Sequence, residues 1–375
     1  MSWTQIKSLT ISDIHFGNPA NPARYVIAGL NKKLTRQYLK DIQVVYIGGD
    51  VFDRSLPVKH QDTPAIISWI RRFLSMCASL GIVVIIIEGT PSHDHLQSEI
   101  FVGINDAAED GFKCELYYVK EVDILFIEKF GIHVLCIPDE KNTSDEVTYN
   151  QVLAMMKARA IEQVDFAIMH GFFEFQVRFG GHTRFHDSEA YMKLVRYLIW
   201  IGHDHEFQQH QRIIVQGSPD RQRHGMESPK GFIKSIVNRD GSFEAEFEVN
   251  QYAMVFKTIE VDDDVDTANK QIYAECDKLP MNGLNHIRIA ANRGHPVLSA
   301  IDSFQASYPF IRFSKKVLDE EKEKEASIIA EDEVPYTPFT IDESNIKTVV
   351  QERLGIALIS PEEKAYFDEL MESIK

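Results

Sequence analysis

The chain has 375 residues, of which 44% are hydrophobic and 26% charged. This composition supports a folded core and excludes wholesale disorder, and the length predicts two or three domains. The formal net charge is −16 at pH 7. Such a charge argues against nucleic-acid binding by a uniformly basic surface, because phosphate contacts need Lys and Arg on the binding face.

The acidic charge is confined to two segments. Residues 1–100 and 151–250 together hold 22 basic and 21 acidic side chains, whereas residues 101–150 and 251–375 hold 18 and 35. The net charge therefore leaves room for a local basic crevice on an otherwise acidic body.

The sequence predicts a cytoplasmic protein. No apolar run is long enough to span a bilayer, and the first residues lack the pattern of a secretory signal. Four widely spaced cysteines, Cys77, Cys114, Cys136 and Cys276, are expected to be reduced core residues.

In the first 250 residues, short apolar runs alternate with helical patterns. We expect strands at residues 6–11, 44–47, 83–87, 166–169 and 198–201, and helices at residues 24–40, 65–80 and 149–160. Three further strand-like runs lie between residues 115 and 136, and short strands fill residues 212–249. This alternation predicts an α/β fold with parallel or mixed sheets.

A second unit is predicted to begin at residue 251 and to end near residue 317. Strand patterns at residues 253–261 and 286–291 flank a helical pattern at 267–278, which indicates a small α+β domain. A charged linker, 318–335, follows. Residues 336–375 contain two amphipathic helical patterns, whose apolar faces need either a partner protein or the chain's own surface.

Asp and His residues follow five predicted strands of the first unit. In chain order they are Asp13, His15, Asp50, His93, His170, His203 and His205. Because the carboxyl ends of strands line the ligand crevice of an open α/β sheet, we expect these side chains to meet. Each alone is explained as a turn residue, a helix cap or a core histidine. Their shared location favours a binuclear metal site, and Asp with His suits Mn²⁺, Fe²⁺ or Zn²⁺, whereas Mg²⁺ prefers oxygen alone.

The order of these motifs resembles the calcineurin-like metallophosphoesterase superfamily over residues 6–237. Gly-Asp-Val-Phe-Asp at 49–53, Gln-Gly-Ser-Pro at 216–219 and Lys-Gly-Phe at 230–232 are similar to its SbcD-type DNA nuclease branch, which includes phage versions. The resemblance implies a four-layer α/β/β/α metallophosphoesterase sandwich at residues 1–250. The second unit, 251–317, would then be a capping and DNA-binding domain, and residues 336–375 a helical partner-binding segment.

The resemblance also implies two sets of metal ligands. One ion would be bound by Asp13, His15, Asp50 and His205. The other would be bound by Asp50, His170 and His203 together with an amide-bearing residue. The usual Gly-Asn-His-Asp motif is replaced by Gly-Thr-Pro-Ser-His-Asp at residues 89–94, which lacks the Asn. Ser92, which precedes His93, is expected to stand in for the amide through its hydroxyl or a held water, and this predicts a weaker second site.

Two further residues receive catalytic roles. His93 is expected to act as a donor or general acid at the leaving oxygen, where a pKa near neutrality is useful. Asp53 lies where some relatives have a second histidine. It is expected either to orient His93 or to cap the following helix.

Basic and aromatic residues surround the predicted site in the sequence. Arg178, Arg184, Arg221 and Arg223 lie in the segments that carry the metal motifs and are candidate DNA contacts. The Phe-rich stretch 172–185 either stacks on an unpaired base or packs on its own aromatic rings.

The function implied is that of a DNA exonuclease and endonuclease that uses two divalent metal ions, with Mn²⁺ expected and Mg²⁺ as the alternative. A coiled-coil ATPase of the SbcC type and a second copy of the chain would be its partners in DNA end processing and recombination, with no role for a membrane. A phage protein would act in the host cytoplasm. The alternatives are a phosphatase or cyclic-nucleotide phosphodiesterase with the same metals, and a structural subunit whose metal site has decayed.

Overall fold

The computed structural model describes residues 3–318 except for residues 110–111, 140–143, 177–183 and 280–284. The chain divides into two units, Met1–Val317 and Leu318–Lys375. The linker and the two helices that the sequence predicts after residue 318 lie outside the described residues. In the part of the chain that is described, no helix is both long and apolar enough to cross a membrane.

Six strands form the first sheet of the sandwich, in the order β12–β11–β1–β2–β3–β4. They are β1 (Gln5–Ile11), β2 (Val44–Gly48), β3 (Val83–Ile87), β4 (Glu115–Val119), β11 (Gly231–Asn238) and β12 (Phe243–Val249). The first four run parallel to one another, while β11 is antiparallel to both β1 and β12. β2 and β3 are apolar throughout because both of their faces are buried.

A second sheet of six strands has the order β5–β6–β7–β8–β10–β9. Its strands are β5 (Asp123–Ile127), β6 (Ile132–Ile137), β7 (Phe166–His170), β8 (Ile199–Gly202), β9 (Gln208–His210) and β10 (Ile213–Val215). The four central strands are parallel, and the two edge strands are antiparallel to their neighbours.

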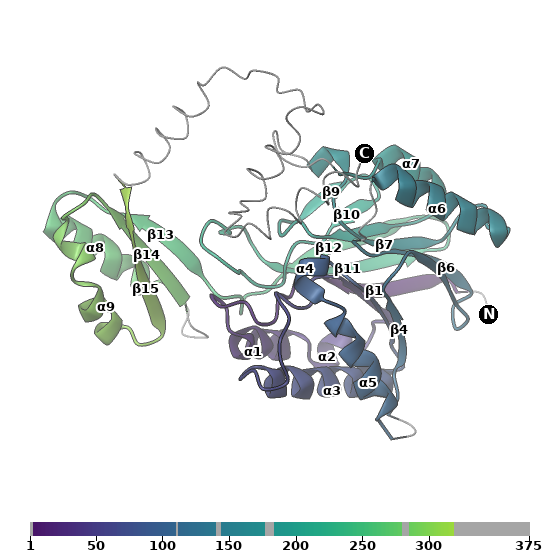
Figure 1. Cartoon of the computed structure of the whole chain (residues 1–375), viewed down its shortest axis with the longest axis horizontal. Helices are drawn as coiled ribbons and strands as arrows, with labels where there is room; N and C mark the ends of the chain where they lie inside the picture. Colours follow the sequence, from purple (N-terminus) through teal and green to yellow (C-terminus); the bar gives the residue numbers. More distant parts are fainter. Residues whose placement is uncertain (1–2, 110–111, 140–143, 177–183, 280–284, 319–375) are drawn as a thin grey trace, which may run out of the picture. The chain divides into compact units, whose positions relative to one another are not determined.

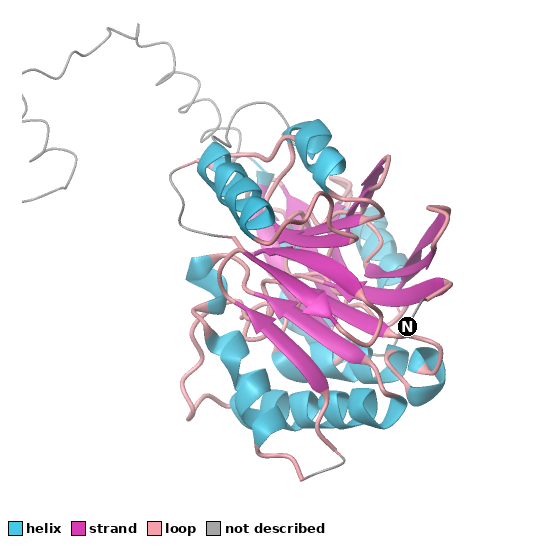
Figure 2. Ribbon diagram, turned by 90° about the vertical axis from the view of Figure 1, so that its right-hand side faces the viewer, coloured by secondary structure: helices cyan, strands magenta, loops and turns pink. Residues whose placement is uncertain are grey.

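The two sheets pack face to face between two layers of helices (Figures 1 and 2). The first sheet is covered by α1 (Ala23–Lys33), α2 (Arg36–Leu39), α3 (Thr63–Leu80) and α5 (Ile100–Asp106), and the second by α6 (Asp145–Ala158) and α7 (Ser188–Leu194). Alternate residues of β2 show the layering: Val45 and Ile47 pack towards the helices, whereas Tyr46 stacks on Trp200 of the second sheet with 4.6 Å between ring centroids. The fold is therefore the four-layer α/β/β/α sandwich that the sequence predicted.

Residues after the sandwich form a third, three-stranded parallel sheet in the order β13–β14–β15. Its elements alternate as β13 (Phe256–Glu260), α8 (Val265–Cys276), β14 (Asn285–Ala291), α9 (Ile301–Ser307) and β15 (Ile311–Val317). Both helices share one apolar core with the sheet, in which Ile272 and Phe304 meet Ile287 and Ile289. We name this segment, Phe256–Val317, the β13–β15 unit.

The remaining short elements are α4 (Pro91–Asp94) and three single turns of 3₁₀ helix, η1 (Gln97–Glu99), η2 (Glu174–Gln176) and η3 (Pro296–Leu298). The four cysteines are buried and free, as expected.

Candidate metal centre

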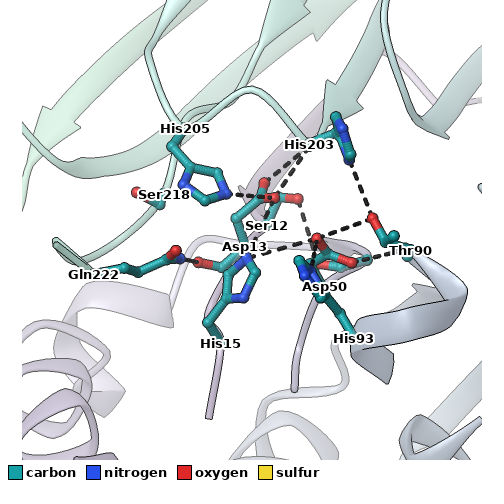
Figure 3. A network of polar contacts seen from close by, with 12 residues as sticks. Ser12, Asp13, His15, Asp50, Thr90, His93, His203, His205, Ser218 and Gln222 are labelled. Atoms are coloured by element: carbon teal, nitrogen blue, oxygen red, sulfur yellow. Dashed lines mark hydrogen bonds and ion pairs between the residues drawn. The ribbon is translucent and has the colours of Figure 1, made fainter. Parts of the chain in front are cut away.

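Five strands of the two sheets deliver Asp and His side chains to the same edge of the sandwich (Figure 3). Asp13 and His15 follow β1, Asp50 follows β2, His93 lies in α4 after β3, His170 ends β7, and His203 and His205 follow β8. These strands run parallel within each sheet, so their carboxyl ends meet. The structure thus brings together all six residues that the resemblance implied as metal ligands with His93 beside them.

The backbone of this edge is held in an unusual conformation. Asp13, His15, Asp50 and His203 have positive φ values of 55°, 52°, 49° and 95°. Such values are uncommon for residues other than glycine, cost roughly 1–3 kcal/mol each and cluster at functional sites. The loops after β1 and β2 support each other, because Asp13 and His15 donate backbone hydrogen bonds of 3.0 Å to the carbonyls of Gly49 and Asp50.

The first group of candidate ligands consists of Asp13, His15 and His205, together with Asp50, which also clusters with His15. His205 Nε2 lies 3.5 Å from Asp13 Oδ1, and His15 Nε2 lies 3.6 Å from Asp50 Oδ2. His15 Nε2 is buried and has no hydrogen-bond partner among the described residues. Burial raises the pKa of Asp13, but its contact with His205 outweighs burial and holds that pKa below the usual value. An unpartnered imidazole nitrogen facing two ionised carboxylates fits a cation.

The second group consists of Asp50, His170 and His203. His170 Nε2 lies 3.4 Å from Asp50 Oδ1 and 3.2 Å from His203 Nδ1. The other nitrogen, Nδ1, donates to the carbonyl of Gly48 at 2.7 Å. Because a carbonyl can only accept, this bond fixes the hydrogen on Nδ1 and leaves the Nε2 lone pair facing the site when the ring is neutral.

The electrostatics of the second group are those of a site for cations. Burial lowers the pKa of His170, but the charges of Asp50 and Asp13 raise it to about 10, whereas burial and the neighbouring His170 lower the pKa of His203 to about 4. The pKa of Asp50 lies well below its usual value despite burial, because His170 faces it. Asp50 thus remains ionised between the two groups and is the residue that they share.

Thr90, and not Ser92, faces the second group. Among the described residues, Ser92 is exposed in the first turn of α4, while Thr90 Oγ1 lies 3.2 Å from His203 Nδ1 and 3.3 Å from Asp50 Oδ2 (Figure 3). The prediction that Ser92 stands in for the missing amide is therefore not supported, because α4 begins at Pro91 and turns Ser92 outward. Matching the motif from Gly89 forwards, rather than from His93 backwards, would have pointed to Thr90.

Asp53 contacts His15 rather than His93. Its Oδ1 lies 3.3 Å from His15 Nδ1 and accepts a hydrogen bond of 2.9 Å from the side-chain amide of Asn18. The next long helix, α3, begins ten residues later at Thr63 and has Asp62 as its N-cap. The expected role of capping the following helix is therefore wrong, and the contact with His15 does not support the role of orienting His93. Asp53 instead orients a candidate ligand of the first group.

His93 stands at the open side of the centre. Its Nδ1 lies 2.9 Å from Asp50 Oδ2, and its side chain is 36% exposed. The hydrogen bond with Asp50 raises the pKa of His93. The structure thus places His93 where a bound substrate could reach its second nitrogen.

Sequence reasoning missed Asp94 as a residue of the centre. Its buried carboxylate accepts hydrogen bonds of 2.8 Å from the backbone amides of Phe52 and Gly89, and burial raises its pKa to about 8. These bonds tie the loop after β2 to the loop after β3. The only signal in the sequence is its place after His93.

The candidate DNA contacts differ in their surroundings. Arg178 lies outside the described residues, Arg184 lies 3.8 Å from Asp145, and Arg223 is exposed. The guanidinium of Arg221 donates to the backbone carbonyls of Met254, Glu227 and Ser228, so it holds the chain together and does not present a free fork to phosphate. This corrects the expectation for Arg221.

The described part of the Phe-rich stretch is mostly packed. Phe173 is buried and stacks on Phe175 with 5.8 Å between ring centroids, and Phe172 meets the ring of His203 edge-on at 4.5 Å. Phe185 is exposed. Packing on the stretch's own aromatic rings is therefore the better description of Phe173 and Phe175.

Comparison with known proteins adds little to this geometry. No protein-family model matches the chain, and no curated protein matches it. Two of the solved structures that resemble it are TT1561 of Thermus thermophilus, at 11% identity, and a second crystal structure at 12% identity, both with a TM-score of 0.36. Each likeness covers 65% of this chain and 99% of the other. The class of the site is therefore argued from this chain alone.

The fold is a four-layer α/β/β/α sandwich, with Asp and His side chains gathered where its parallel strands end. The cluster is a candidate site for divalent metal ions, because its carboxylate oxygens and imidazole nitrogens converge in groups whose ligand atoms lie within 4.8 Å of one another.

Proposed function

We propose that this chain is a metal-dependent phosphodiesterase that cleaves DNA, a nuclease of the SbcD type. The observation that carries the proposal is that Asp50 belongs to both candidate ligand groups. A shared carboxylate places two ions next to each other, and pairs of ions about 3.5–4 Å apart are typical of enzymes that hydrolyse phosphate esters. Mn²⁺, with Mg²⁺ as the alternative, fits the mixed Asp and His ligands.

Ions held by these residues would supply Lewis-acid chemistry, orienting an attacking water and neutralising charge on the phosphate. His93 supplies what the ions do not. Its Nδ1 is engaged by Asp50 at 2.9 Å, so its Nε2 is the nitrogen available to the leaving oxygen. Asp50 raises the pKa of His93, which favours the protonated ring that a general acid needs.

The stretch that resembles the nuclease branch, residues 216–232, donates hydrogen bonds to the backbone of two candidate ligands. Lys230 is buried, and its Nζ donates to the carbonyl of His205 at 2.6 Å. Ser218 donates a backbone hydrogen bond of 3.3 Å to the same carbonyl, and Gln222 donates to the carbonyl of Asp13 at 3.2 Å. A contiguous stretch built around His205 and Asp13 favours the nuclease branch over the phosphatases, which commonly lack it.

The proposal is tested by cleavage of end-labelled duplex DNA with Mn²⁺ or Mg²⁺. The wild-type chain is expected to release nucleotides, and Asp50→Asn and His203→Ala are expected to abolish the release. Variants as active as the wild type would contradict the enzymatic role and favour a structural subunit. Fast hydrolysis of a small phosphomonoester or cyclic nucleotide, with DNA left intact, would favour the phosphatase or phosphodiesterase alternative.

We also propose a coiled-coil ATPase of the SbcC type and a second copy of the chain as partners, acting on DNA ends in repair and recombination. The support is the amphipathic pattern of residues 336–375 in the sequence. Co-purification of the full chain with such an ATPase, and its loss from a chain that ends at residue 317, is the expected result. Equal recovery of both chains would place the docking surface elsewhere.

A further inference from the structure

Thr90 occupies the N-cap position of α4 but does not cap it. Its φ and ψ are −59° and 125°, and its side chain makes no hydrogen bond to the helix. A threonine at this position ordinarily accepts a hydrogen bond from an amide of the first turn, which stabilises a helix by about 1 kcal/mol. Here the hydroxyl points instead towards the second group of candidate ligands (Figure 3).

The distances around the hydroxyl are those of ligands that share one ion. Thr90 Oγ1 lies 3.2 Å from His203 Nδ1, 3.3 Å from Asp50 Oδ2 and 3.5 Å from His170 Nε2. Neighbouring ligands that each lie about 2.1 Å from an ion in octahedral or tetrahedral geometry are about 3.0–3.4 Å apart. The backbone of Thr90 is fixed as well, because its amide donates to Asp50 Oδ1 at 2.6 Å.

The four atoms also have too few hydrogens to satisfy one another. With both rings neutral, His170 Nε2 carries no hydrogen because Nδ1 donates to Gly48. The Asp50 carboxylate presents acceptor oxygens, Oδ1 to the Thr90 amide and Oδ2 to the Thr90 hydroxyl. The hydroxyl of Thr90 has a single hydrogen, so lone pairs of oxygen and nitrogen face one another across a space that suits a cation.

Asp139 lies beside Thr90 and offers the hydroxyl a second acceptor besides Asp50 Oδ2. Its carboxylate follows β6, and its backbone amide donates to the carbonyl of Glu88 at 3.4 Å. A hydroxyl that gives its hydrogen to a carboxylate keeps both oxygen lone pairs for a metal. Sequence reasoning missed Asp139, although it too follows a buried strand of the second sheet.

We propose that the Thr90 hydroxyl is the fourth protein ligand of the second metal site, oriented by Asp139. The inference rests on the proposed binding of two ions by this centre. A neutral hydroxyl is a weaker donor than an amide oxygen, so the second site fills at higher metal concentration than the first. On this proposal, occupancy of the second site depends on the concentration of free divalent metal.

The test measures Mn²⁺ binding to the full chain by electron paramagnetic resonance and by calorimetry. The wild type is expected to bind two ions with unequal affinity. Thr90→Val keeps the shape of the side chain and removes its oxygen, so the weaker dissociation constant should rise at least about tenfold while the tighter one is unchanged. Thr90→Ser should bind both ions as the wild type does, and Thr90→Asn should tighten the weaker site.

Ser92→Ala is the matched control two residues away and should change neither dissociation constant. The inference is overturned if Thr90→Val binds both ions with wild-type affinities, if Ser92→Ala loses the weaker ion, or if the wild type binds no second ion. These results are separable from the proposed function. If Thr90→Val loses the second ion but the wild-type chain cleaves no DNA, the role of Thr90 as a metal ligand stands and the proposed nuclease activity is refuted.

Discussion

The contact between Asp53 and His15 makes Asp53 a positioning residue for a metal ligand. A carboxylate 3.3 Å from Nδ1 favours the tautomer with its hydrogen on Nδ1, and Nε2 then faces Asp13 and Asp50. Asp53→Asn is therefore expected to weaken Mn²⁺ binding at the tighter site by about 10–100-fold, with the fold retained. Calorimetry with Mn²⁺ measures this change, and the exposed Asp41→Asn is the control. If Asp53→Asn cleaves more slowly but binds Mn²⁺ as the wild type does, Asp53 acts on His93 instead of on a metal ligand.

His93 should affect the chemical step and leave the bound metal in place. Replacing His93 with Ala is expected to slow cleavage by about 10²–10⁴-fold at saturating Mn²⁺. Because the folded-state pKa of His93 is raised, the acid form persists to higher pH than in a free imidazole, and the wild-type rate should fall as pH rises through that pKa. Single-turnover rates between pH 6 and 10 measure both effects. A variant that keeps the alkaline fall in rate would exclude His93 as the acid.

The local sequence predicted the role of some residues of the centre but not of others. Asp13, His15 and Asp50 follow runs of buried strand, and this placement was enough to predict that they meet. The roles of Thr90 and Ser92 depend on which of them precedes the first turn of α4. The sequence does not predict where α4 begins, because a helix of a single turn has no repeating apolar pattern. Asp53 was misassigned because its partner, His15, lies across the loops that follow two different strands.

At the scale of elements, the centre depends on how closely the loop after β3 approaches the loop after β2. A Cβ at Gly89 would lie 2.1 Å from Asp50 N and 2.2 Å from Asp50 Oδ1. Gly89→Ala is therefore expected to displace Asp50, the residue that both ligand groups share. The variant should lose Mn²⁺ binding at both sites and unfold at lower denaturant concentration than the wild type.

Gly103 in α5 provides the matched control for Gly89. A Cβ there meets nothing within 4 Å. Gly103→Ala should leave Mn²⁺ binding unchanged and raise the free energy of unfolding by up to about 1 kcal/mol, because alanine is the better helix former. Urea denaturation and Mn²⁺ titration of both variants measure the two effects. Wild-type binding by Gly89→Ala would show that the loops can move apart without loss of the site.

The elements that the sequence predicted are those with a long apolar pattern of one period. β2, β3 and β7 are buried on both faces and lie where their apolar runs predicted. The helix expected at residues 24–40 is divided, since Thr35 accepts a hydrogen bond from the Tyr38 amide and starts α2 afresh. α9 and β15 were not predicted, because each has only seven residues and β15 is largely exposed along one face.

At the scale of the whole molecule, the distribution of charge is as important as its sum. The segments that carry the centre hold 22 basic and 21 acidic side chains. Several of those acidic side chains, including Asp13 and Asp50, are turned inward at the candidate metal centre, and bound divalent ions would offset their charge. The net charge of −16 therefore does not oppose contact with DNA at this edge.

The segment that leads from β12 into the β13–β15 unit, residues 250–255, is held by hydrogen bonds that centre on Asp220. Its Oδ1 accepts from the backbone amides of Met254 and Arg221, each at 2.7 Å, and the Arg221 guanidinium returns a bond of 3.0 Å to the Met254 carbonyl. Asn250 adds a bond of 2.8 Å to the carbonyl of Pro219. Burial outweighs these hydrogen bonds and raises the pKa of Asp220 to about 6.

This raised pKa predicts a stability that falls as pH rises. Between the unfolded pKa of about 4 and the folded value, the folded state holds the proton more tightly, so unfolding becomes easier across that range by roughly 3 kcal/mol. Asp220→Asn keeps the Oδ1 acceptor and removes the charge. It should therefore be more stable than the wild type at pH 8, with a difference that shrinks towards pH 4. Urea denaturation at both pH values measures this difference in the free energy of unfolding. The contribution of the buried histidines cancels in the comparison, because both proteins contain them. Equal destabilisation of Asp220→Asn at every pH would show that the join needs the charged carboxylate.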